Sequence, residues 1–223
     1  MWRRTDAFLH RLECSGGRAT LFVHPRSAIA AGADLGLRIR ALLGRGHEIG
    51  QHTHFYADGE RDGKPRSDLS ADNVRHCLER DHRFLCDAGV EPRGFVAGAW
   101  AIVDAVGPWL REHGFAYDAS VRAFPLTYES DAASRGDDRH AAETEDGIVR
   151  LPTTAPVSRI LRRDVGRARV ADVEYELLYL HDYDLLRRRS RAAAGALLLT
   201  SRHVRWSTAA ELAALALNER TRP

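Results

Sequence analysis

The sequence predicts an α/β fold built on a parallel sheet or barrel. Short apolar runs rich in β-forming residues alternate with longer runs in which apolar residues recur at helical spacing. Glycine follows the end of most helical runs, as expected where helices stop. No internal repeat or low-complexity linker divides the chain. Because 223 residues suffice for one domain with a substantial core, we expect a single α/β domain spanning residues 1–223.

The first half of the chain reads as strand–helix pairs. A β-rich run stops at Pro25, which is typical of a buried strand, and Gly44-Arg45-Gly46 and Gly89 each end a helical run. The predicted elements, in order, are a strand at 18–24, a helix at 28–43, a strand at 47–52, a polar loop at 57–65 and a helix from Asp68 or Ser70 to Ala88.

The second half continues the alternation. Gly114 ends a helix and Pro152 ends a strand, and a capping box of Ser207 or Thr208 with Glu211 begins the last helix. The predicted elements are a strand at 94–97, a helix at 102–113, a strand at 115–120, a loop at 123–147, strands at 148–151 and 173–181, and helices at 190–199 and 208–217.

Composition excludes several classes of protein. The 33 Lys+Arg and 31 Asp+Glu leave a formal charge of +2, so no nucleic-acid partner is expected. The three cysteines, Cys14, Cys77 and Cys86, lack the spacing of a zinc ribbon and are odd in number for a disulfide framework. No apolar run is long enough for a membrane span. Arg3 and Arg4 are not followed by the core of a signal peptide, so we expect a cytoplasmic protein with reduced thiols.

Polar side chains gather where predicted strands end, which is where active sites lie in α/β barrels. His52 and His54 are two positions apart, so both imidazoles project from the same side of an extended segment and can reach one cation. A catalytic zinc needs three protein ligands, and a histidine in a loop is more often simply hydrogen-bonded. Other polar residues at strand ends are His24, Asp118, Ser120, His181 and Asp182.

The segment Gly46-His-Glu-Ile-Gly-Gln-His-Thr53 resembles the second motif of the polysaccharide deacetylase family, the NodB-homology domain of carbohydrate esterase family four. The resemblance extends in order over nearly the whole chain. It includes the segments 18–23 (RATLFV), 68–70 (DLS), 91–95 (EPRGF), 114–120 (GFAYDAS), 180–182 (LHD) and 206–212 (WSTAAEL).

This resemblance implies a distorted (β/α) barrel and metal-assisted hydrolysis of a carbon–nitrogen bond, typically removal of acetyl groups from an N-acetylated sugar. It implies a divalent metal, normally zinc, held by an aspartate of motif one and two histidines of motif two. His52 matches the first of these histidines, and we assign His52 and His54 as metal ligands, with His24 as an alternative. His181 matches the late histidine that protonates the leaving amine, and Asp118 matches the acidic residue of motif "YDxS" and would orient it.

The sequence also departs from the family pattern. Tyr56 stands where the second histidine of motif two is expected, and Val96 stands at the arginine position of motif three. The motif-one strand, with its aspartate base, is predicted to be missing from this sequence, because the segment around Asp6 corresponds to the helix that follows that strand. Either the protein begins upstream of Met1, or the chain lacks its base and one metal ligand. The barrel is therefore expected to lack its first strand.

Three functional hypotheses remain open: a metal-dependent deacetylase, a non-catalytic relative that binds a glycan or a partner, and a hydrolase of small cyclic amides. Trp100 and Trp109 either line the substrate pocket or belong to the core.

Overall fold

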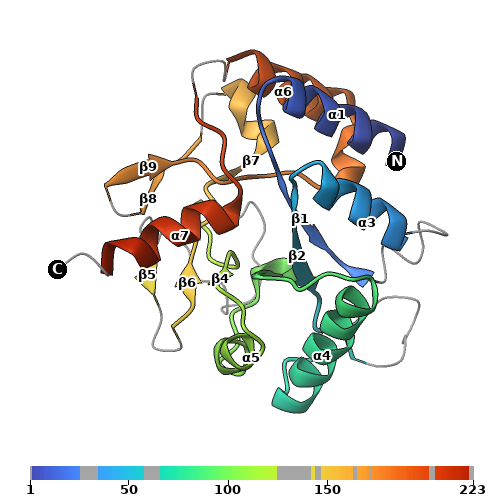
Figure 1. The fold of residues 1–223 in the computed structure, drawn as a ribbon, viewed down its shortest axis with the longest axis vertical. Coiled ribbons are helices and arrows are strands. Elements are labelled where there is room, and N and C mark those ends of the chain that lie inside the picture. The colour runs from blue at the N-terminus through green and yellow to red at the C-terminus, as the bar shows by residue number, and fades with distance from the viewer. Residues whose placement is uncertain are drawn as a thin grey trace.

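The computed structural model describes residues 2–25, 35–57, 66–124, 142–143, 147–162, 165–170, 172–200 and 204–220 (Figure 1). Its α-helices are α1 (Trp2–Cys14), α3 (Leu35–Gly44), α4 (Ala71–Asp87), α5 (Val106–Glu112), α6 (Arg188–Thr200) and α7 (Ala209–Arg220). Its strands are β1 (Thr20–Val23), β2 (Glu48–Thr53), β3 (Gly94–Ala97), β4 (Tyr117–Asp118), β5 (Ala142–Glu143), β6 (Val149–Arg150), β7 (Ala155–Pro156), β8 (Ala168–Val170), β9 (Val173–Tyr175) and β10 (Leu178–Tyr179). Short 3-10 helices are η1 (Gly98–Trp100), η2 (Val157–Arg162) and η3 (Asp182–Leu186).

The central sheet has the strand order β1-β2-β3-β4-β6-β5. The first five strands in this order run parallel, and β5 pairs antiparallel with β6. The described strands do not close into the predicted barrel. After β6 the chain continues into β7, which pairs with β10 rather than with β1, so the sheet is open between its two edges.

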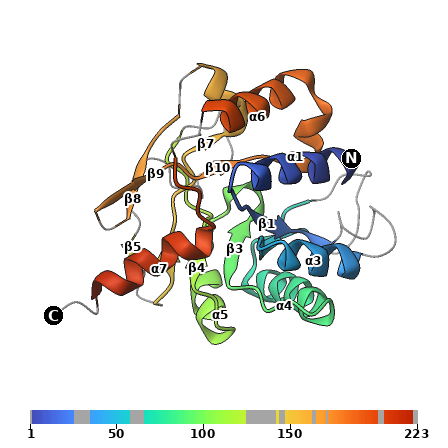
Figure 2. The ribbon, with the colours of Figure 1, turned by 45° about the horizontal axis from the view of Figure 1, so that its top comes forward.

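Helices cover this sheet and form its core. In both views α4 and α5 lie side by side, while α1 and α6 pack together at another part of the molecule (Figures 1 and 2). One core cluster joins α4, α5 and β3 through Leu78, Phe95 and Trp109. Trp109 is only 1% exposed, so this tryptophan belongs to the core and not to a substrate pocket.

The helix α1 precedes β1 and is tied to the turn before β2. Glu13 on α1 accepts hydrogen bonds from Arg45 and from Nε2 of His47, at 2.6 and 2.8 Å. Burial acts to raise the pKa of Glu13, but the hydrogen bonds from Arg45 and His47 outweigh it and the pKa is lowered. Asp6 lies on α1, as predicted, and accepts a hydrogen bond from Arg45 at 2.6 Å.

At the amino ends of the strands, Glu48 of β2 connects the sheet to α7. Its carboxylate accepts hydrogen bonds from the hydroxyls of Thr20 and Tyr117, each at 2.7 Å, and from the backbone N–H of Ala210 at 3.0 Å. A negative charge at a helix N-terminus is favourable. The predicted capping box is confirmed, because Thr208 N–H donates to the carboxylate of Glu211, 2.7 Å away.

Most predicted elements are found, several with shorter bounds. The predicted strand at 173–181 is wrong as one element: residues 173–175 form β9, which pairs with β8, and residues 178–179 form β10, which pairs with β7. The expected helix at 102–113 begins only at Val106, and the expected strand at 115–120 has two residues, Tyr117 and Asp118. Most of the predicted loops at 57–65 and 123–147, and the first part of the helix at 28–43, lie outside the described residues.

None of the helices in the described part of the chain is both long enough and apolar enough to cross a bilayer.

Candidate functional site

Three histidines meet at the carboxyl ends of the parallel strands β1 and β2. His24 directly follows β1, His52 lies near the end of β2, and His54 directly follows β2. The ring centres are 4.7 Å apart for His52 and His54, 5.1 Å for His24 and His54, and 5.8 Å for His24 and His52. We call these residues the histidine cluster. The sequence-based expectation that His52 and His54 project to the same side is met.

The hydrogen bonds of His52 determine where its proton lies. Nδ1 of His52 is 3.0 Å from the backbone carbonyl oxygen of Val96 on β3, and a carbonyl can only accept, so Nδ1 carries the hydrogen. In the neutral ring, Nε2 then has the lone pair. Nε2 of His52 lies 3.1 Å from Nε2 of His54. A histidine whose other nitrogen donates to a carbonyl is oriented as metal-binding histidines commonly are.

Both histidines are held in the neutral form. The pKa of His52 is lowered to about 4, mainly by burial and in smaller part by the positive charge that His54 would carry. Burial also lowers the pKa of His54 to about 4, with a smaller contribution from His24. At neutral pH both imidazoles are therefore neutral, with one N–H and one lone pair each. This is the state needed to bind a metal or accept a proton.

The turn after β3 packs directly against His54. A Cβ atom at Gly98 would overlap with Nδ1 of His54, so only glycine leaves room for the ring where it stands. The next two residues, Ala99 and Trp100, have φ angles of 55° and 58°, which are unfavourable for residues with side chains. The ring of His54 also stacks on Tyr56, with the ring centres 4.9 Å apart.

Aromatic side chains form a second group beside this turn. Trp100 contacts Phe124 and Tyr179 edge-on, with ring centres 5.8 and 5.3 Å apart, and Phe124 and Tyr179 stack at 5.9 Å. We call these three residues the aromatic group. Trp100 and Tyr179 are half-buried and Phe124 is buried, so parts of the first two rings remain open to contact from outside.

His181 lies two residues after β10, immediately before η3, and next to the aromatic group. Its ring is 5.5 Å from Tyr179 and stacks on Tyr183 at 4.6 Å. The His181 side chain is 47% exposed, and its Nδ1 is 3.2 Å from a carboxylate oxygen of Asp184. A charge on His181 contributes to the lowered pKa of both His52 and His54, so the three lie within electrostatic reach of each other.

Asp118 has different neighbours from those expected. Its carboxylate accepts hydrogen bonds from the backbone N–H of Ser120, at 2.8 Å, and from the Ser120 hydroxyl. The Ser120 hydroxyl in turn accepts the backbone N–H of Ala97, at 2.8 Å. Burial raises the pKa of Asp118, although the hydrogen bonds from Ser120 oppose this. Asp118 therefore anchors the end of β3, whereas the carboxylate bonded to His181 is Asp184, a residue that the sequence analysis did not identify.

The described residues fit a divalent metal only in part. His52 and His54 offer two neutral nitrogen donors that face each other. Within the described part of the chain, no group of three or more His, Cys, Asp or Glu side chains is already arranged to hold a metal ion. Two ligands are fewer than the three that a catalytic zinc usually has.

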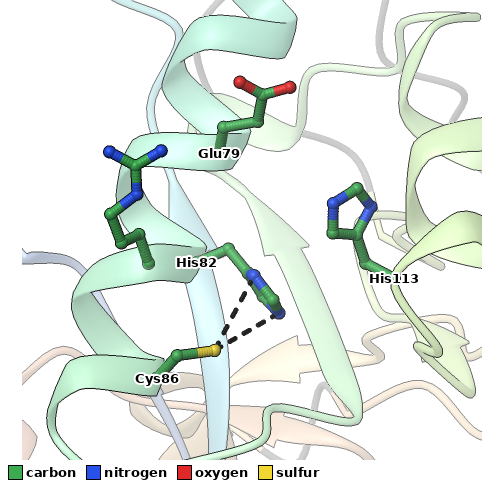
Figure 3. A pocket seen from close by; sticks show the side chains of 5 residues that line it. Glu79, His82, Cys86 and His113 are labelled. Atoms are coloured by element: carbon green, nitrogen blue, oxygen red, sulfur yellow. Dashed lines mark hydrogen bonds between the residues drawn. The ribbon is translucent and has the colours of Figure 1, made fainter.

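A separate concavity of about 350 Å³ lies between α4 and the end of α5, and none of the histidine cluster lines it (Figure 3). It is lined by Glu79, His82, Arg83, Cys86 and His113. Burial raises the pKa of the Cys86 thiol, which disfavours the reactive thiolate. His82 packs its ring against Trp109 and His113, with ring centres 5.5 and 5.2 Å away, so its contacts join α4 to α5.

Comparison with solved structures identifies the fold. Neither a protein-family model nor a curated protein sequence matches the chain. A protein assigned as a polysaccharide deacetylase, from Mycobacterium smegmatis, has a TM-score of 0.62 and 19% identity, over 99% of this chain and 79% of that one. The peptidoglycan deacetylase PdaC from Bacillus subtilis, in an aspartate-to-serine variant, has a TM-score of 0.53 and 14% identity, over 98% and 87%.

A family 4 acetyl xylan esterase from Clostridium thermocellum, solved with a cobalt ion, has a TM-score of 0.52 and 17% identity, over 95% of this chain and 84% of the esterase. These proteins share an architecture across almost the full length of the chain, although few of their residues are the same. The chain has the NodB-type fold of the polysaccharide deacetylases.

Proposed function

We propose that this protein is a hydrolase of the polysaccharide deacetylase type, which removes acetyl groups from an N-acetylated sugar by cleaving a carbon–nitrogen bond. The observation that carries the proposal is the pair of imidazole nitrogens, Nε2 of His52 and of His54, 3.1 Å apart at the carboxyl ends of the strands. Active sites of α/β barrels lie at these ends. The shared fold with deacetylases and an esterase supports the class of reaction.

His52 and His54 are the proposed ligands of a divalent metal, with zinc expected for nitrogen donors. The cobalt ion in the family 4 esterase supports a divalent metal in proteins of this fold. When bound, such a metal supplies a Lewis acid that polarises the acetyl carbonyl. The low pKa of both histidines favours binding at neutral pH, because neither imidazole carries a positive charge that would repel a metal cation.

His181 is the proposed general acid. Its exposed ring can approach a bound substrate, and the carboxylate of Asp184 accepts the hydrogen of Nδ1, which leaves Nε2 to transfer a proton to the departing amine. Asp184 takes the orienting part that the sequence analysis gave to Asp118. We retain Asp118 in the site as the residue that, through Ser120, holds the strand end beside His52 and His54.

A sugar substrate would contact the aromatic group. The partly exposed rings of Trp100 and Tyr179 suit the apolar C–H face of a sugar ring. The ring of Tyr179 also lies beside that of His181, the proposed general acid. A small cyclic amide would need less of this surface. Substrates of two sizes therefore distinguish the carbohydrate hypothesis from the amide hypothesis.

The alternative function is non-catalytic binding of a glycan. The described residues hold no complete set of metal ligands, and Val96 stands where the family has an arginine. Both observations favour a protein that binds a glycan at this site without hydrolysing it.

Release of acetate from N-acetylated chitooligosaccharides and peptidoglycan fragments, with zinc or cobalt present, tests the proposal. A small cyclic amide serves as the comparison substrate. We expect acetate release by the parent protein, strong loss in His52→Ala and His181→Ala, and no loss in His76→Ala, whose histidine is exposed on α4. Glycan binding that is unchanged in His181→Ala, without any acetate release by the parent protein, would instead establish the non-catalytic alternative.

A further inference from the structure

We propose that His24 is the third metal ligand, so that the histidine cluster supplies three imidazoles to one metal ion. This inference rests on the proposed function, because it concerns the same metal. It assigns a role to His24, which directly follows β1 and lies beside the two histidines already proposed as ligands.

The geometry of the sheet brings the three residues together. β1 and β2 are parallel and paired, with Val23 opposite Gln51. His24 follows Val23 and His52 follows Gln51. The two histidines therefore lie opposite each other on neighbouring segments, about 4.8 Å apart. His54 lies two positions beyond His52, on the same side of the chain. Three imidazoles therefore start from adjacent backbone positions at one end of the sheet.

The separations match those around one ion. In a tetrahedral zinc site with nitrogen ligands at about 2.0–2.1 Å, two such nitrogens are about 3.3 Å apart and the centres of their rings about 5 Å apart. The observed Nε2–Nε2 distance is 3.1 Å, and the three ring centres are 4.7, 5.1 and 5.8 Å apart. The longest separation joins His24 to His52.

Two of the rings are fixed and the third must turn. Val96 holds His52 through its carbonyl, and Gly98 and Tyr56 pack against His54. As the described side chains stand, no group of three is ready to hold an ion. A rotation of His24 about its two side-chain torsions changes its nitrogen positions without moving the backbone. Metal binding is thus expected to reorient His24 and to leave His52 and His54 almost unchanged.

The ligand chemistry predicts which ions bind. Neutral imidazoles suit zinc, cobalt, nickel and copper, whereas magnesium and calcium require oxygen ligands. A three-histidine site should therefore take up Zn²⁺ and Co²⁺ and reject Mg²⁺. A site that kept carboxylate ligands would bind hard cations more readily.

Calorimetric titration of the purified protein with Zn²⁺, and the visible absorption of bound Co²⁺, test the inference without reference to turnover. We expect one ion per chain, a loss of affinity of more than about tenfold in His24→Ala, and a changed Co²⁺ spectrum. His76→Ala is the matched control and should bind as the parent does. Circular dichroism establishes that each variant is folded.

A second readout needs no variant. In nitrogen-detected NMR spectra of the parent protein, Zn²⁺ should shift the signals of three imidazoles. Shifts confined to two imidazoles, or an unchanged affinity in His24→Ala together with loss in His52→Ala, would overturn the role of His24 and leave the proposed function standing. Metal binding that depends on all three histidines, without acetate release, would overturn the proposed function and leave this inference standing.

Discussion

Removing the carboxylate of Glu48 should destabilise the protein more than removing any other single polar group at the amino ends of the strands. Glu48→Ala leaves three donors without their acceptor, from Thr20, Tyr117 and Ala210. Hydrogen bonds to a charged group contribute about 1.5–3 kcal/mol each to the free energy of unfolding. A donor that loses its acceptor recovers part of this energy where it can bond to water instead. Tyr117 is 0% exposed, so its hydroxyl cannot recover a partner from water.

We expect Glu48→Ala to lower the free energy of unfolding by about 4 kcal/mol, and Tyr117→Phe to lower it by about 2 kcal/mol. The two changes share one hydrogen bond, so the double variant should lose about 2 kcal/mol less than the sum of the single losses. For a chain of 223 residues, the loss in Glu48→Ala corresponds to a fall in Tm of about 8–16 °C.

Urea denaturation followed by circular dichroism measures all four free energies, provided that the transitions are two-state. Tyr175→Phe is a comparison for removal of a buried tyrosine hydroxyl at a site away from Glu48. Strictly additive losses in the double variant would refute the reasoning, because they would mean that the contact between Glu48 and Tyr117 contributes no coupling energy.

The remaining predictions concern the histidine cluster and one helix. In metal-free protein, the pKa values of His52 and His54 are about 4 when folded and near 6.5 when unfolded. The unfolded state therefore binds more protons than the folded state in this pH range. The free energy of unfolding should fall as pH drops from about 6.5 to 4, by up to about 3 kcal/mol per histidine. In urea titrations at several pH values, His54→Gln should show a weaker pH dependence of this free energy. Gly98→Ala should displace the His54 ring and weaken Zn²⁺ binding in calorimetry, while circular dichroism stays native. Gly195→Ala, inside α6 with open space around it, should raise the free energy of unfolding by about 0.5–1 kcal/mol, measured by thermal denaturation.

Local patterns in the sequence predicted elements better than they predicted pairing. The apolar spacing and glycine stops located α4 and α6 closely. The run 173–181 alternates like a single strand, but its two halves pair with different partners, β8 and β7, which are known only from the tertiary fold. Strand closure depends on the same long-range choices, and for that reason the open arrangement of the described strands could not be foreseen.

The candidate site was predictable where its geometry is local. The spacing of His52 and His54 is sufficient to place both on one side of an extended chain. The partner of His181 was missed, because Asp184 reaches it only through the 3-10 turn of η3, which has no clear signature in the sequence. The family pattern predicted that Asp118 orients His181. In the structure, the carboxylate of Asp118 instead accepts a hydrogen bond from Ser120.

The turn formed by Gly98, Ala99 and Trp100 links the two halves of the site mechanically. Two consecutive residues with positive φ cost about 1–2 kcal/mol each, so the turn persists only while its surroundings enforce it. Trp100 enforces it from one side through Phe124 and Tyr179, and Gly98 meets His54 on the other. A change in how the aromatic rings pack therefore alters the space available to an imidazole that they do not touch. The residues proposed to contact a sugar and the residues proposed to bind a metal are therefore coupled through this turn.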